Sequence, residues 1–424
     1  MLEKFININV YQEDRVNTLR KIALILTALL PLLLLFSRAL ADVATILVGI
    51  LFVTYCIKEK YYNFLKQPIS IALLLLWAWF LISSLFAFSS ISKAFSVSFV
   101  FVRYILFFFA CINWLFTETA AIKFAIKIIT ITILIAALDT LLQFTTGTSI
   151  SGKPQMGGRL TSFLRRPDIG IYLAKLIFPL AAFWLWQASS DRKNLLLSCF
   201  LLFFVISIVL LTGERTATAL CLASIGGILL IIGVSNKNLR SYVLLGITGI
   251  FGMFSILVYR SEFLYARMMN FISDIGNFPD SLYGQLFKAS LLTWKEHGFF
   301  TGVGLRQFRD VCPTFQASGQ VTYCDLHSHN IYLEILSESG LVGLILFSVF
   351  VMLCLYQIWQ SSIATYNKNT TGFVSNICIL GGLVLILFPF SVTMSFITNW
   401  SGILNWVGIS LCIAISRLIN SSNK

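Results

Sequence analysis

Charged side chains are scarce in this sequence of 424 residues: 12% are Asp, Glu, Lys or Arg, whereas 58% are hydrophobic. A soluble domain carries about 25% charged residues, so the composition excludes a soluble enzyme or binding module. Apolar runs of roughly 20 residues recur from end to end, and each is long enough to cross a bilayer as a helix. The sequence therefore predicts an all-α polytopic membrane protein.

The usual cofactor signatures are also absent. The sequence contains no glycine-rich phosphate loop, no dinucleotide-binding fingerprint, no CxxC pair and no cluster with zinc-ligand spacing. Its aspartates are too scattered to indicate a metal-dependent transferase, so we expect neither a cofactor nor a metal. The net charge is +13, but no basic stretch alternates with exposed aromatic residues, which argues against a nucleic-acid partner.

Twelve membrane spans are predicted. The first apolar run, Ile22 to Phe36, leads into Ser37 and Arg38 without a small-residue cleavage site, so we expect it to remain as the first span rather than be removed as a signal peptide. The predicted spans cover residues 22–37, 41–57, 69–88, 95–116, 121–142, 169–187, 195–211, 216–233, 242–258, 339–359, 373–392 and 402–418.

Basic residues orient these spans. An even number of spans places both termini on one side, where 15 of the 31 lysines and arginines lie, against 13 on the other side. Two long segments, 143–168 and 259–338, hold ten of those 13, and long segments cross the membrane largely regardless of charge. The basic residues of the short loops favour cytoplasmic termini. We therefore expect three parts: residues 1–258 with the first nine spans, a large periplasmic loop 259–338, and residues 339–424 with the last three spans.

Ten cations on the outer side oppose the usual charge bias, which indicates that they bind an anion such as phosphate. Arg215 lies in the tight turn Thr212–Ala217, where the alternative is a snorkelling arginine paired with Glu214. Arg159 opens a second segment, in which Arg165 and Arg166 precede Pro167 and Asp168 at a predicted helix start. Both arginines are candidates for an anion clamp at the membrane face.

All three histidines lie in the large outer loop. His329 stands where this loop runs into span ten, beside Asn330, which is a suitable cap for the helix that follows. A histidine at this place can accept a proton from a hydroxyl, although histidines that only make structural hydrogen bonds fit the pattern equally well. Further along, Glu334 and Glu338 share one helix face, and Gly340 and Gly343 allow close packing.

The outer loop has further features. Residues 282–297 place Phe287, Leu291 and Trp294 on one helical face, with Gly298 as the helix stop and Gln285 and Lys288 on another face. Cys312 and Cys324 are the only cysteines outside the spans, on the side predicted to be oxidising, so we predict that they form a disulfide. Closing this short loop would stabilise the protein by about 3 kcal/mol. Within the spans, Asp139 is a candidate partner for the charge of Arg103.

Several of these segments together resemble the O-antigen ligase and polymerase superfamily. The resemblance rests on Trp294–Phe308, on His329–Glu334 and on Gly340–Gly343, and it extends to Arg159–Asp168 and to Arg215 as two outer arginine motifs. It implies a GT-C-like membrane glycosyltransferase of the Gram-negative inner membrane, working on the periplasmic face among the lipids of that membrane. The expected donor is a glycan on undecaprenyl pyrophosphate, and the expected acceptor of a ligase is lipid A–core.

The resemblance also implies residue roles. His329 is the expected base and Arg215 the expected pyrophosphate clamp, in an inverting reaction without metal. Related proteins often carry an arginine near the start of this helix, where this chain has Gln285, so we expect Lys288, one turn later, to supply that charge, with Arg267 as the alternative. The remaining candidates for substrate binding are Arg159, His327 and Arg306.

The resemblance leaves two alternatives open. An O-antigen polymerase would share all of these motifs, and we favour a ligase because a chain of this length lacks the extra carboxy-terminal domain of larger protein-glycosylating relatives. A polytopic transporter would also have twelve spans and intramembrane charges such as Arg103, Asp139 and Lys175, but the sequence shows no two-fold repeat.

Overall fold

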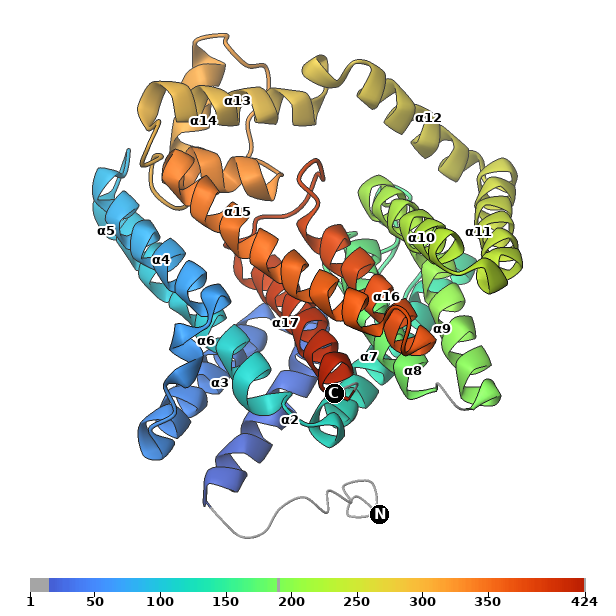
Figure 1. The fold of residues 1–424 in the computed structure, drawn as a ribbon. Helices are drawn as coiled ribbons and strands as arrows, with labels where there is room; N and C mark the ends of the chain where they lie inside the picture. The colour runs from blue at the N-terminus through green and yellow to red at the C-terminus, as the bar shows by residue number, and fades with distance from the viewer. Residues whose placement is uncertain (1–14, 189–190, 423–424) are drawn as a thin grey trace.

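The computed structural model describes residues 15–188 and 191–422 (Figure 1). Within these ranges the protein is all α-helical, and two isolated bridges, Thr148 to Pro154 and Met156 to Arg159, are its only β pairings. The all-α prediction is therefore confirmed. The helices are α2 (Arg15–Phe36), α3 (Arg38–Glu59), α4 (Pro68–Ser83), α5 (Ile91–Val100), α6 (Val102–Ala110), α7 (Thr119–Thr146), α8 (Ile169–Gln187), α9 (Arg192–Leu211), α10 (Arg215–Ser235), α11 (Arg240–Arg260), α12 (Glu262–Gly276), α13 (Leu282–His297), α14 (Phe308–Ala317), α15 (Ile331–Thr365), α16 (Thr370–Leu387) and α17 (Asn399–Ser421).

Twelve segments of the described chain are helical, long and apolar enough to cross a membrane, and they coincide with the twelve predicted spans. The eleventh differs at its end, because α16 stops at Leu387 and not at residue 392. Pro389 explains the early stop: it disfavours helical geometry at Phe388, whose ψ of 124° is extended. Residues 388–398 consequently form a non-helical segment that returns to the body of the protein before α17.

The tenth span also begins differently. Helix α15 starts at Ile331, eight residues before the predicted span, and the Asn330 side chain caps it by accepting a 3.0 Å hydrogen bond from the Leu333 N–H. The helix kinks at Gly340, which has a φ of 72°. A Cβ atom at this position would lie 2.1 Å from the carbonyl oxygen of Phe300, so only glycine fits. The kink separates a short helical entry, 331–339, from the membrane-length part of α15.

Helices α8 and α17 form the centre of the bundle. In the most apolar stretch of each of these two helices, 89% and 94% of the residues are buried. In the corresponding stretch of the span that contains α11, only 6% are buried. Helix α11 therefore stands at the edge, and α12 runs from it across to α13 (Figure 1). Because α8 and α17 are buried along most of their length, they hold the loop segments before α8 and after α16 in fixed positions.

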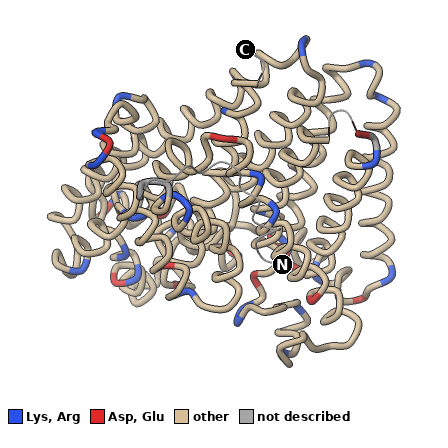
Figure 2. The backbone as a smooth tube through the Cα atoms, turned by 90° about the horizontal axis from the view of Figure 1, so that it is seen from below, with Lys and Arg blue, Asp and Glu red and all other residues tan. Residues whose placement is uncertain are grey.

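The intramembrane charge of Arg103 has a partner, although not the predicted one. Arg103 of α6 makes a 2.8 Å ion pair with Asp42 of α3, so its predicted pairing with Asp139 is wrong. Asp139 instead accepts hydrogen bonds of 2.6 Å from the Ile150 N–H and the Ser162 hydroxyl, both in the loop after α7. A loop that folds back onto a helix end needs such an acceptor for its buried donors. Charged residues occupy only a small part of the chain in Figure 2.

The outer loop contains α12, α13 and α14. The predicted helix 282–297 is confirmed as α13, and Gly298 follows its last residue. Of the apolar residues placed on one face of this helix, Leu291 is exposed, whereas Leu286, Ala289 and Thr293 are buried. Helix α13 packs against both α14 and α15, so small and aliphatic side chains fill its inner face.

Cys312 of α14 and Cys324 are joined in the structure, with their Cα atoms 5.8 Å apart. Seven other cysteines are free, and six of these are buried. We therefore expect the unfolded protein to label seven thiols without reductant and all nine after reduction. Labelling of nine thiols without reductant, measured by intact mass, would contradict both the disulfide and an oxidising location for this loop.

Candidate active site

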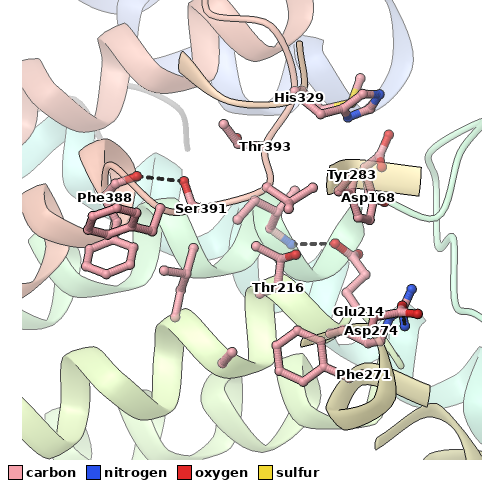
Figure 3. A pocket seen from close by; sticks show the side chains of 18 of the residues that line it. Asp168, Glu214, Thr216, Phe271, Asp274, Tyr283, His329, Phe388, Ser391 and Thr393 are labelled. Carbon is pink, nitrogen blue, oxygen red and sulfur yellow. Dashed lines mark hydrogen bonds and ion pairs between the residues drawn. The ribbon is translucent and has the colours of Figure 1, made fainter. Parts of the chain in front are cut away.

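A cavity of about 790 Å³ lies where four connections between spans meet. These are the segment before α8, the turn before α10, the outer loop with α12 and α13, and the segment after α16. Figure 3 places His329 and Thr393 on one side of this cavity and Glu214, Asp274 and Phe271 on the other. The cationic and histidine side chains that line it are Arg159, Arg166, Arg215, Arg267 and His329.

Two glycine turns present Arg159 and Arg215. Gly158, directly before Arg159, has a φ of 72°, and Gly213, two residues before Arg215, has a φ of 71°. A Cβ atom on either glycine would come within 2.8 Å of the Phe263 ring of α12. Only glycine at both positions leaves room for the Phe263 ring, which packs α12 against the two turns. This packing brings Arg267 of α12 to the same cavity.

Each clamp candidate has a defined partner. Arg215 Nη1 lies 2.6 Å from Asp274 Oδ2, and the Nη2 of Arg159 donates to the Pro167 carbonyl at 2.7 Å. Arg267 Nε donates to the Gly213 carbonyl at 3.4 Å. The buried Nε of Arg159 has no hydrogen-bond partner among the described residues.

The predicted alternative, in which Arg215 pairs with Glu214, is not what the structure contains. The Glu214 carboxyl points to the start of α8, where it accepts hydrogen bonds from the Gly170 N–H at 2.5 Å and the Ile171 N–H at 3.2 Å. A helix N-terminus has unpaired N–H groups, which explains why the carboxyl lies there. This leaves Arg215 free to face the cavity and α12.

The electrostatics favour an anionic ligand. Burial raises the pKa of Glu214 to about 8, and burial also raises the pKa of Asp168. The Glu214 carboxyl is therefore mostly protonated at neutral pH and adds little negative charge beside the arginines. Burial, followed by the charges of Arg215 and Arg159, lowers the pKa of Arg267. An anion bound between these arginines would reduce the repulsion between their positive charges. Arginine suits phosphate because its planar guanidinium offers paired donors.

His329 is held from several directions. Its Nε2 lies 3.0 Å from Asp325 Oδ2, and its carbonyl oxygen accepts a 2.8 Å hydrogen bond from the Thr393 N–H. The Tyr283 ring of α13 packs edge-on at 5.7 Å between centroids. The neighbouring Asn330 donates to the carbonyl oxygens of Pro389 and Ser391. The segment after α16 thus fixes the backbone of His329 at the cavity.

The other histidines occupy different surroundings. The His327 ring lies 4.0 Å from the His329 ring but does not line the cavity. Burial, followed by the nearby His329, lowers the pKa of His327 to about 3, so this ring is neutral. His297 packs against Phe88 and Phe315 outside the cavity. The structure therefore brings one of the three histidines to the arginines.

Three of the predicted cationic or polar positions lie outside the cavity. Lys288 is exposed on α13, and the backbone N–H of Arg306 donates to the Glu338 carboxylate at 2.7 Å. Gln285 is buried and joins two loop segments, since its Nε2 donates to the Pro279 carbonyl and its Oε1 accepts from the Thr322 N–H. Arg267 lines the cavity and is the better candidate for the missing charge.

Sequence reasoning missed three polar residues near this site: Asp274, Tyr283 and Asp325. It named Arg166 in the run before Pro167 but assigned it no role of its own. The amphipathic pattern of 262–276 was a signal for α12 and hence for Asp274. In the part of the chain that the structure describes, no group of three or more His, Cys, Asp and Glu side chains could hold a metal ion.

One protein family matches part of this chain. Residues 200–348, which extend from α9 into α15, match the family described as O-antigen ligase. The matched segment includes Arg215, Arg267 and His329 and thus three of the residues at the cavity. No curated protein matches the chain. Over these residues, about a third of its length, the chain is similar to the O-antigen ligase family.

Proposed function

We propose that this protein is an O-antigen ligase, which transfers a glycan from undecaprenyl pyrophosphate to a hydroxyl of lipid A–core. One observation carries the proposal: a single cavity combines His329 with four arginines from three separate parts of the chain. A histidine can accept a proton from a sugar hydroxyl, and arginines can hold a pyrophosphate. The transfer of a glycan from a lipid pyrophosphate requires both.

The proposed step is a direct displacement. The acceptor oxygen forms a bond to the anomeric carbon while its proton passes to the His329 ring. The bond between the anomeric carbon and the pyrophosphate oxygen breaks, and its electron pair leaves with undecaprenyl pyrophosphate. Attack opposite to the leaving group inverts the anomeric centre. No metal enters this step, because the arginines stabilise the negative charge that develops on the leaving pyrophosphate.

The fold supports a location at the periplasmic face of the inner membrane. The four connections at the cavity follow spans five, seven, nine and eleven, so they lie on one side if each span crosses the membrane once. With cytoplasmic termini this is the outer side. The joined pair Cys312 and Cys324 agrees with an oxidising compartment.

Deletion of the gene, followed by gel analysis of the lipopolysaccharide, tests the proposal against its alternatives. A ligase defect removes all bands above lipid A–core and leaves long glycans on the lipid carrier. A single repeat on the core would instead identify a polymerase. Unchanged glycan on both carriers would contradict either transferase, and a transporter would form no glycosidic bond in a purified system.

We expect Arg267, and not Lys288, to supply the third cation. Arg267→Ala should lower kcat/KM for the pyrophosphate donor by about 10-fold or more, because it removes a cavity charge. Lys288→Ala is the matched control and should stay within about two-fold of the wild type, as expected for an exposed site. Steady-state transfer assays check both values. The reverse order of effects would return the role to Lys288.

A further inference from the structure

We propose that Asp325 is a positioning residue, which holds the His329 ring in the tautomer that works as a base. This inference rests on the proposed transfer function. Nothing in the sequence pattern of the histidine motif indicated a role for Asp325, and it does not line the cavity itself. It acts through its contact with His329 Nε2, at 3.0 Å from Asp325 Oδ2.

The contact determines which ring nitrogen can accept a proton. An ionised carboxylate only accepts hydrogen bonds, so Nε2 of His329 must carry the hydrogen between them. The neutral ring then has its lone pair on Nδ1, and this atom is the base for the acceptor hydroxyl. A carboxylate in this place also stabilises the imidazolium that forms during transfer.

Asp325 remains ionised because its surroundings donate hydrogen bonds to it. Burial favours the protonated carboxyl, but the Leu326 N–H and the contact with His329 outweigh it and hold the pKa of Asp325 below its usual value. The Leu326 N–H donates to Oδ1 at 2.6 Å. The two carboxylate oxygens therefore have separate tasks: Oδ1 fixes the side chain to the backbone, and Oδ2 faces the histidine.

The disulfide anchors this arrangement. Cys324 directly precedes Asp325 and is joined to Cys312, which is buried in the core of the outer loop with Leu286 and Phe308. On the other side of the histidine, the Thr393 N–H holds the His329 carbonyl. Asp325 and His329 are thus tied to two different parts of the protein, which fixes their relative position.

These separate tasks make the asparagine variant diagnostic. In Asp325→Asn, the amide oxygen should stay on the Leu326 N–H, because the reverse orientation would place two donors face to face. The amide NH2 would then point at Nε2 and force the hydrogen onto Nδ1, which removes the base. Asp325→Ala leaves the ring free to adopt either tautomer. The asparagine variant, although closer in shape, should be the less active of the two.

The test measures kcat and KM for transfer of an undecaprenyl-pyrophosphate glycan to lipid A–core by the purified full-length protein. We expect kcat to fall about 10-fold in Asp325→Ala and about 100-fold in Asp325→Asn, with Asp325→Glu closest to the wild type. KM should change little, because Asp325 does not line the cavity. In a His329→Ala background, Asp325→Asn should cause almost no additional loss.

An asparagine variant as active as the alanine variant, or a loss confined to KM, would overturn the role of Asp325. Folding of each variant is judged by gel filtration in detergent, and if Asp325→Asn does not fold, the kcat order of the glutamate and alanine variants decides. An inactive wild type under the same conditions would instead count against the proposed function.

Discussion

Replacing His329 with alanine should lower the turnover of glycan transfer by about 10² to 10⁴-fold, which is the usual contribution of a general base. The acceptor hydroxyl would then have to attack without a group to take its proton. The donor should still bind, because the arginines at the cavity remain in place. We therefore expect the loss in kcat and not in KM for the donor.

His297→Ala is the matched control for this variant. His297 lies in the same outer loop but packs against Phe88 and Phe315, away from the cavity. It should retain activity within about two-fold of the wild type. His327→Ala should have an intermediate effect, since its ring packs at 4.0 Å from that of His329. Near wild-type transfer by His329→Ala would show that another group is the base.

Replacing Arg215 with alanine should lower kcat/KM by about 10² to 10³-fold, comparable to removing one donor from a charge-stabilising site. Two effects combine here. The variant loses a planar cation for the pyrophosphate, and it leaves the Asp274 carboxylate, 2.6 Å from Arg215 in the wild type, without its partner in an anion site. Repulsion between this carboxylate and the donor adds to the lost contact.

The two effects are separable by further variants. Arg215→Lys should recover only part of the activity, because lysine offers a point charge and not paired planar donors. The double variant Arg215→Ala, Asp274→Ala should be more active than Arg215→Ala alone, since it removes the unpaired carboxylate. Steady-state kinetics over a range of donor concentrations measures these values. Full activity of the lysine variant would mean that only charge matters at this position.

Periodicity and composition predicted the spans well because a bilayer imposes a simple rule on every crossing helix. The positions of the twelve spans, the Asn330 cap and α13 all followed from local sequence. The early end of α16 had a local signal in Pro389, which lies inside the predicted eleventh span. Local rules failed where distant segments meet: only glycine fits at position 340, because the carbonyl oxygen of Phe300, 40 residues earlier, lies so close.

The candidate site also combines residues that local sequence indicated with contacts that only the folded chain makes. Arg159, Arg215 and His329 were found from sequence because their residue types and places at span ends already indicate phosphate and proton chemistry. The choice of Arg267 over Lys288 depends on how Phe263 seats α12 against two glycine turns, which no spacing rule contains. Likewise, the partners of Arg103 and Arg215 are Asp42 and Asp274, each from another helix.

A reconstituted transfer assay tests the central claim most directly. The purified wild-type protein and its His329→Ala and Arg215→Ala variants would receive an undecaprenyl-pyrophosphate glycan and lipid A–core, without nucleotide and in the presence of a metal chelator. We predict that the wild type forms the glycan–lipid A–core product and that both variants fold but form at least about 100-fold less. A wild type that forms no glycosidic bond, or variants that match it, would contradict the assignment of this cavity as the site of glycan transfer.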